Sequence, residues 1–182
     1  MNEEVTVATA AEMRVLGNRL ALLLRAGDLV ILSGPLGAGK TTLTQGIGDG
    51  LGVRGPVTSP TFVIARVHPS LVPARGLAAS GPALVHADAY RLGSALEMDD
   101  LDLDADTATS VTVVEWGEGL AEGLATDRLE ITIAPGPVVA EGALPDGDSA
   151  LEGGSPRTVT ISGIGKRWRG IQLPPADLAD RL

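Results

Sequence analysis

The residues with the clearest chemical potential lie in one short segment, 34–41, which reads GPLGAGKT and fits the pattern GxxxxGK[ST] at every fixed position. Glycines allow backbone N–H groups to turn toward phosphates, while Lys40 would neutralise the β and γ phosphates and the Thr41 hydroxyl would reach Mg²⁺. Of the 14 basic residues, only Lys40 and Lys166 are lysines. A chain that otherwise uses arginine therefore has a lysine where phosphate binding needs a slim point charge. The segment predicts a nucleoside triphosphate site, with binding residues Gly34, Pro35, Leu36, Gly37, Ala38, Gly39, Lys40, Thr41 and Thr42.

Two acidic residues end apolar segments further along the chain. Asp88 closes LVHAD and Glu115 closes VTVVE. A phosphate-binding loop works with a carboxylate at the end of a neighbouring strand, which holds Mg²⁺ directly or through water. Either residue could serve, or could simply meet solvent, and the spacing alone does not rank them.

Two threonines each allow two interpretations. Thr61, in SPTF, could sense the γ-phosphate as switch segments do, or could belong to a Ser-Pro turn that opens a strand. Thr9, in TAAE, has the form of a helix capping box but could also approach the nucleotide base. Spacing alone favours the turn for Thr61 and the cap for Thr9.

The remaining polar and aromatic candidates have simple structural interpretations. His68 and His86 have no cysteine nearby to complete a metal cluster, so we interpret them as buried or loop histidines. Trp116 is typical of a core or rim aromatic residue. The basic run 166–169 is typical of a solvated helix face, although it could contact a partner.

The elements that must position these residues alternate between strand and helix. Residues 29–32 predict a buried strand and 41–51 a helix, although Gly46, Gly48 and Gly50 each weaken that helix by roughly 1 kcal/mol. Apolar residues at helical spacing predict a first helix from the capping box up to Gly27. Further strands are predicted at 61–67, 83–87, 110–115, 129–133 and 157–162, with a short helical stretch after Trp116.

The chain of 182 residues predicts a single α/β domain. Residues 1–133 would form its core, and 157–182 would add a last strand and helix to the same domain. Residues 68–82 are rich in proline, and residues 134–156 are rich in glycine, proline and acidic residues. Both compositions predict solvent loops, and the second loop is predicted to be a flexible insertion.

Composition excludes several classes of protein. The absence of cysteine excludes a disulfide framework and a cysteine nucleophile, and suits a reducing cytoplasm. A net charge of −9 and 2% aromatic residues disfavour independent nucleic-acid binding, which relies on basic and stacking side chains. With neither a signal peptide nor a membrane-length apolar run, we expect a cytoplasmic protein without a membrane partner.

Taken in order, the motifs resemble the TsaE (YjeE) family, the small ATPase of the pathway that installs threonylcarbamoyl on an adenosine of certain tRNAs. The resemblance runs from residue 9 to about 133. It rests on GPLGAGKTT, SPTF, HADAYRL and VEW, at residues 34–42, 59–62, 86–92 and 114–116.

The resemblance implies a P-loop NTPase with a mostly parallel central sheet flanked by helices. It implies slow Mg²⁺-dependent ATP hydrolysis, TsaD and TsaB partners, and only indirect contact with tRNA. Carried over residue by residue, it places Lys40 on the phosphates, Thr41 and Glu115 on Mg²⁺, Asp88 in turnover, Thr61 in a switch-like segment and Trp116 beside the nucleotide. Against the family pattern, the loop 68–82 is longer than usual, and 134–156 resembles an insertion before the last strand.

Two other functions remain open at this point. A small-molecule kinase would need a lid of arginines, which Arg66, Arg75 and Arg91 could supply. A nucleotide switch would use ATP occupancy alone, with hydrolysis incidental. The sequence contains no clear guanine-reading NKxD element, which favours adenine.

Overall fold

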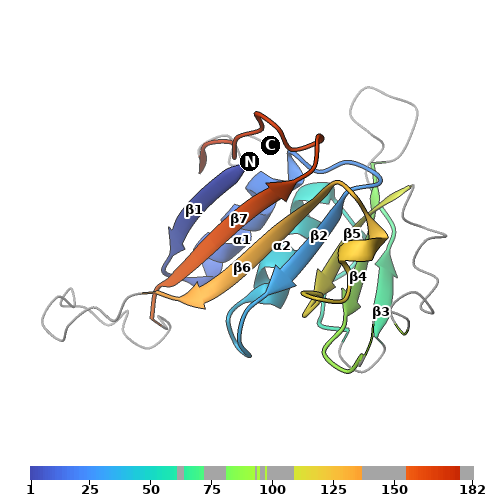
Figure 1. Cartoon of the computed structure of the whole chain (residues 1–182), viewed down its shortest axis with the longest axis horizontal. Helices are drawn as coiled ribbons and strands as arrows, with labels where there is room; N and C mark the ends of the chain where they lie inside the picture. Colours follow the sequence, from blue (N-terminus) through green and yellow to red (C-terminus); the bar gives the residue numbers. More distant parts are fainter. Residues whose placement is uncertain are drawn as a thin grey trace, which may run out of the picture.

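The computed structural model describes residues 1–60, 64–71, 81–92, 94, 97, 109–136 and 155–176. These residues form one seven-stranded sheet with two α-helices and one 3-10 helix (Figure 1). The strands are β1 (Asn2–Val7), β2 (Leu29–Ser33), β3 (Ala65–His68), β4 (Ala83–Asp88), β5 (Ser110–Glu115), β6 (Arg128–Pro135) and β7 (Arg157–Ile164). The helices are α1 (Ala10–Ala21), α2 (Lys40–Leu51) and the 3-10 helix η1 (Glu122–Leu124).

The strands lie in the order β1-β7-β6-β2-β5-β4-β3. The four central strands are parallel, because β2 pairs in parallel with both β6 and β5, and β5 pairs in parallel with β4. The three outer pairings are antiparallel. The predicted mostly parallel arrangement is therefore confirmed in the centre of the sheet, and the sheet as a whole is mixed. The carboxyl ends of the central strands share one edge, where open α/β sheets bind ligands.

The two faces of the sheet are covered differently. Both α-helices pack on one face, and the segment 116–125 with η1 lies on the other (Figure 1). The predicted flanking helices are thus found, among the described residues, on one face. Because β2 and β5 are covered on both faces, every residue of either strand is buried, which explains their nearly continuous apolar sequences.

Glycines allow the two helices to approach closely. A Cβ at Gly46 would collide with the Arg14 carbonyl oxygen, and one at Gly17 with the Leu43 carbonyl oxygen. The glycines that lower the intrinsic helix propensity of α2 therefore permit its contact with α1, and this packing offsets their cost.

Helix α1 is shorter than the sequence predicts, since it ends at Ala21 rather than near Gly27. The backbone N–H of Arg25 donates to Asp28 Oδ2 at 2.9 Å, and Arg167 donates to the Leu23 carbonyl oxygen at 2.6 Å. These bonds replace helical ones. The helical spacing of Leu23 and Leu24 instead reflects packing against the same core.

The edge strand β1 is absent from the sequence-based prediction. Its side chains alternate between more exposed and more buried positions, with Val5 and Val7 facing inward. It pairs only with β7 among the described strands, and β7 begins at Arg157. Two valines in an acidic segment give little local signal, so the strand depends on a partner distant in sequence.

The basic run 166–169 forms turns rather than the predicted solvated helix face. Trp168 is fully buried, and the Arg167 guanidinium lies 4.3 Å from the centre of its ring. No α-helix occurs at described residues 165–175, and the end of the chain from 177 lies outside the described residues.

Residues 61–63, most of 68–82 and 137–154 also lie outside the described residues, so the predicted strand 61–67 is found only as β3. No described helix could cross a membrane, being too short or too polar.

His68 predicts a pH dependence of stability. Its side chain is buried on β3, and burial lowers its pKa below the usual 6.5, helped by the nearby His86 and Arg66 and opposed by a hydrogen bond with the Arg54 backbone. Because the unfolded chain binds this proton more readily, the free energy of unfolding should fall as the pH drops from about 6.5 through the lower folded pKa. The slope from this one group would be at most about 1.4 kcal/mol per pH unit. Urea denaturation of wild type and His68→Gln between pH 7.5 and 5 checks this; equal slopes in the two proteins would contradict it.

Candidate functional site

The loop between β2 and α2 contains the phosphate-loop motif and depends on its glycines. Gly34 has φ +140°, and a Cβ there would collide with the Ile133 carbonyl oxygen on β6. Gly39 has φ +111° and forms the N-cap of α2 without any side-chain cap. Backbone N–H groups at a helix N-terminus that no side chain caps favour an anion.

The two candidate carboxylates lie side by side at the edge of the sheet where this loop begins. Asp88 ends β4, Glu115 ends β5, and the parallel register pairs them directly. Both are almost completely buried, at 5% and 3% exposure. The Asp88 carboxylate accepts a hydrogen bond from the Tyr90 backbone N–H at 2.9 Å, which orients it.

Glu115 also contacts the phosphate-loop motif itself. The Thr41 hydroxyl donates to the Glu115 carboxylate, at 2.8 Å from Oε1 and 3.1 Å from Oε2. This contact joins the first turn of α2 to the end of β5. The two residues that the sequence resemblance assigns to Mg²⁺ are therefore adjacent, and both present oxygen.

His86 is a site residue that sequence reasoning missed. It is fully buried on β4, and its Nε2 lies 2.7 Å from Glu115 Oε1. The sequence signal was its position two residues before Asp88, on the same side of the strand. Without the pairing of β4 with β5, that signal does not identify Glu115 as its partner.

Lys40 lies at the centre of the site. Its ammonium donates to the carbonyl oxygens of Gly34, at 2.8 Å, and Pro35, at 3.0 Å, and lies 3.6 Å from the centre of the Trp116 ring. Burial lowers the pKa of Lys40 below its usual 10.5, while the negative charges of Glu115 and Asp88 raise it. The lysine is therefore a buried cation held among carbonyls, an aromatic face and two carboxylates.

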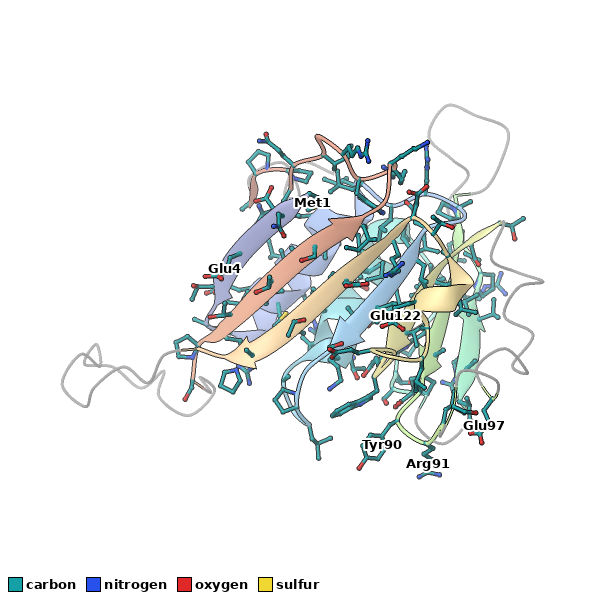
Figure 2. All side chains as sticks on the ribbon, in the orientation of Figure 1. Met1, Glu4, Tyr90, Arg91, Glu97 and Glu122 are labelled. Atoms are coloured by element: carbon teal, nitrogen blue, oxygen red, sulfur yellow. The ribbon has the colours of Figure 1, made fainter. Side chains whose placement is uncertain are left out.

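Trp116 adopts a strained backbone. It has φ +60°, a conformation that costs a bulky residue on the order of 1–3 kcal/mol. Its backbone N–H donates to the Leu32 carbonyl oxygen at 2.8 Å. This geometry brings the ring over Lys40 and 5.1 Å from the Tyr90 ring. Tyr90 is 65% exposed and projects outward beside Arg91 (Figure 2).

Five of these side chains line one cavity of about 220 Å³. Its lining includes Lys40, Thr41, Asp88, Glu115 and Trp116, together with Leu36, Gly37, Gly39, Thr42 and Ser59. Thr61 lies outside the described residues, although its neighbour Ser59 reaches the cavity. Three arginines could supply the lid of a kinase. Arg75 lies outside the described residues, while Arg66 and Arg91 are not among the lining residues of this cavity.

Thr9 has the predicted capping role and also lines a cavity beside the loop. Its hydroxyl accepts the Glu12 backbone N–H at 3.1 Å. It also lines a second cavity, of about 110 Å³, with Met13, Gly39 and Thr42. Arg157, at the start of β7, lines this cavity and a neighbouring one beside Pro35 and Ala38, and sequence reasoning missed it.

Comparisons with known proteins identify the family to which the chain is similar. The family model described as threonylcarbamoyl adenosine biosynthesis protein TsaE matches residues 7–138. A Streptomyces coelicolor protein named tRNA threonylcarbamoyladenosine biosynthesis protein TsaE is 60% identical over 157 residues, covering 86% of this chain and 93% of its own length. A Bacillus subtilis protein of the same name is 31% identical over 159 residues, covering 86% and 83% respectively.

A solved structure is also similar over the whole chain. The crystal structure of Bacillus subtilis YdiB matches with a TM-score of 0.67 and 25% sequence identity, covering 100% of this chain and 95% of that one. The family model spans the phosphate-loop motif, both carboxylates and the central strands. The chain therefore belongs to the TsaE family of threonylcarbamoyladenosine biosynthesis proteins.

Proposed function

We propose that this chain is a Mg²⁺-dependent ATPase that supports threonylcarbamoyladenosine formation on tRNA, together with TsaD- and TsaB-like partners. The observation that carries the proposal is the single cavity lined by Lys40, Thr41, Asp88 and Glu115. A cation, a hydroxyl and two carboxylates beside a helix N-terminus are the groups that phosphoryl transfer requires.

The loop and α2 would hold the triphosphate. Backbone N–H groups from Gly37 to Thr42 would bind phosphate oxygens, and the Lys40 ammonium would exchange its carbonyl partners for the β and γ phosphates. The lysine is already buried at the site, so little side-chain ordering remains to be done on binding.

The residues around Glu115 fit Mg²⁺. The Thr41 hydroxyl and the Glu115 carboxylate are hard oxygen donors in direct contact, at the place where the β and γ phosphates would lie. When bound, Mg²⁺ would supply positive charge that neutralises the phosphate oxygens. Glu115 would hold it directly or through water.

Asp88 would act on the attacking water. The water oxygen forms a bond to the γ phosphorus while the bond to the β,γ-bridging oxygen breaks, and that electron pair leaves on ADP. Asp88 orients the water, accepts its proton and returns it to the phosphate product. Lys40 would stabilise the negative charge on the transferred group. Thr61, in the switch-like segment that follows Ser59, would sense the γ-phosphate or its Mg²⁺.

The base would lie toward the second cavity. Thr9, Met13 and Arg157 line it, and it borders the same loop as the first cavity. Asp88 is not among its lining residues, which suits the end of the nucleotide opposite the phosphates. Trp116, whose ring contacts Lys40, would lie beside the phosphates of the nucleotide. Adenine is favoured because the sequence has no clear guanine-reading element.

The family and the charge support the proposed partners. The relatives are named for tRNA threonylcarbamoyladenosine biosynthesis. A chain with a net charge of −9 is poorly suited to bind tRNA alone, so TsaD- and TsaB-like proteins would supply the tRNA contacts.

Measuring phosphate release tests the proposal. Purified protein would be incubated with ATP or GTP, with and without Mg²⁺ and the TsaB and TsaD partners. We expect slow Mg²⁺-dependent release from ATP that the partners increase several-fold, with less from GTP. Transfer of phosphate to a metabolite would instead indicate a kinase, and partner-dependent tRNA modification without any hydrolysis would indicate a switch.

A further inference from the structure

Three side chains in contact connect α2, β5 and β4 at the candidate site. Thr41 donates to Glu115, and Glu115 Oε1 lies 2.7 Å from His86 Nε2. His86 is fully buried, and Glu115 is 3% exposed. The parallel register places His86 opposite Val113, two residues before Glu115, so the imidazole reaches along the sheet to the carboxylate.

The contact has the geometry to fix the orientation of the Glu115 carboxylate. Oε1 is shared between His86 and Thr41, whereas Oε2 lies 3.1 Å from the Thr41 hydroxyl. A carboxylate held at one oxygen by a buried ring cannot rotate freely about its last bond. Its second oxygen therefore stays close to Thr41 on α2, at the wall of the cavity that both residues line.

The surroundings of His86 indicate that this contact is the reason for a histidine at this position. His86 Nδ1 is buried and has no hydrogen-bond partner among the described residues, so Nε2 makes the ring's polar contact. A buried polar atom without a partner costs free energy, and an apolar side chain would avoid that cost. Leu84, on the same face of β4, shows that the core accepts one.

We propose that His86 is a positioning residue that orients Glu115 for the divalent cation of a bound nucleotide. The inference rests on the proposed function. Carboxylates that bind metals are themselves held by hydrogen bonds, and removing such a bond typically weakens metal affinity or activity by about 10- to 100-fold. The step acts through Glu115, so His86 itself touches neither nucleotide nor cation.

Two conservative variants separate positioning from packing. In His86→Gln the amide nitrogen reaches the place of Nε2 and can still donate to Glu115. In His86→Asn the shorter side chain places its amide near Nδ1, and the contact is lost. His86→Leu also removes the donor, without burying an amide, and serves if the Asn variant does not fold. His68→Gln is the matched control, because it alters a second buried histidine that is not among the hydrogen-bond partners of Glu115 in the described part of the chain.

The measurement is binding rather than turnover. Titration calorimetry would follow the slowly hydrolysed analogue ATPγS in EDTA and at increasing Mg²⁺ concentrations, with thermal unfolding as a check of the fold. We expect unchanged affinity in EDTA for every variant. The quantity compared is the Mg²⁺ concentration that gives half of the gain in ATPγS affinity. It should rise at least about tenfold in His86→Asn and His86→Leu. In His86→Gln and His68→Gln it should stay within about threefold of the wild-type value.

The outcomes distinguish this inference from the proposed function. If wild type responds to Mg²⁺ and folded His86→Asn or His86→Leu responds equally, His86 does not position Glu115, and the proposed function stands. If His86→Gln is as impaired as His86→Leu, the role is packing and the inference is wrong. If wild type itself fails to bind ATPγS, the proposed function fails and this inference with it.

Discussion

Replacing Lys40 with alanine is expected to abolish measurable ATP binding while the protein stays folded. The ammonium is the buried cation of the cavity and makes two short hydrogen bonds to loop carbonyls, so it is already in place for phosphate oxygens. Charge-assisted hydrogen bonds contribute about 1.5–3 kcal/mol each, and losing two of them weakens binding at least about 100-fold. Titration calorimetry with ATP and Mg²⁺ measures this directly.

Lys166→Ala is the matched control for that experiment. It removes the chain's other lysine, which is exposed in the turns after β7, and should leave ATP affinity unchanged. Thermal unfolding of both variants shows whether the fold persists, because Lys40→Ala also removes the contact with Trp116. Wild-type affinity in folded Lys40→Ala would contradict the placement of the triphosphate on this loop.

Replacing Asp88 with asparagine is expected to separate binding from hydrolysis. The amide keeps an oxygen that can accept the Tyr90 backbone N–H, so the end of β4 should stay intact. It cannot accept a proton from water, and loss of a general base typically lowers turnover by about 10²- to 10⁴-fold. We expect ATP affinity close to wild type and phosphate release reduced by at least about 100-fold.

Asp49→Asn makes the same chemical change at an exposed aspartate near the carboxyl end of α2, away from the loop. It should leave phosphate release at the wild-type rate, measured with and without the partners. Normal turnover in Asp88→Asn would remove Asp88 from the proposed mechanism. Loss of binding together with turnover would give it a role in holding the nucleotide instead.

The sequence predicted the centre of the fold because local patterns carry the information there. Residues 29–32 and 111–114 are nearly continuous apolar runs, since the strands they form are covered on both faces. The loop motif is equally local, because its glycine at position 34 has φ +140°, a backbone conformation that residues with a side chain rarely adopt. Each of these features depends mainly on residues close together in the chain.

Errors arose where distant segments decide the outcome. Helix α1 ends early because Asp28 and Arg167 capture backbone groups that would otherwise continue it. Strand β1 exists because β7, from the far end of the sequence, pairs with it. Trp168 is buried within the core that contains α1 and α2, although its basic neighbours suggest an exposed position.

The sequence by itself determined the phosphate-loop motif, the two strand-end carboxylates and the family, because each is written in a short run of residues. Only the tertiary structure decided that Asp88 and Glu115 are neighbours, that Thr41 contacts Glu115 across 74 positions, and that His86 lies beneath them. The physical reason is that hydrogen bonds act over about 3 Å in space, whatever the separation in sequence. Which groups come within that distance is set by the pairing of β2, β4 and β5 and by the packing of α2 against them.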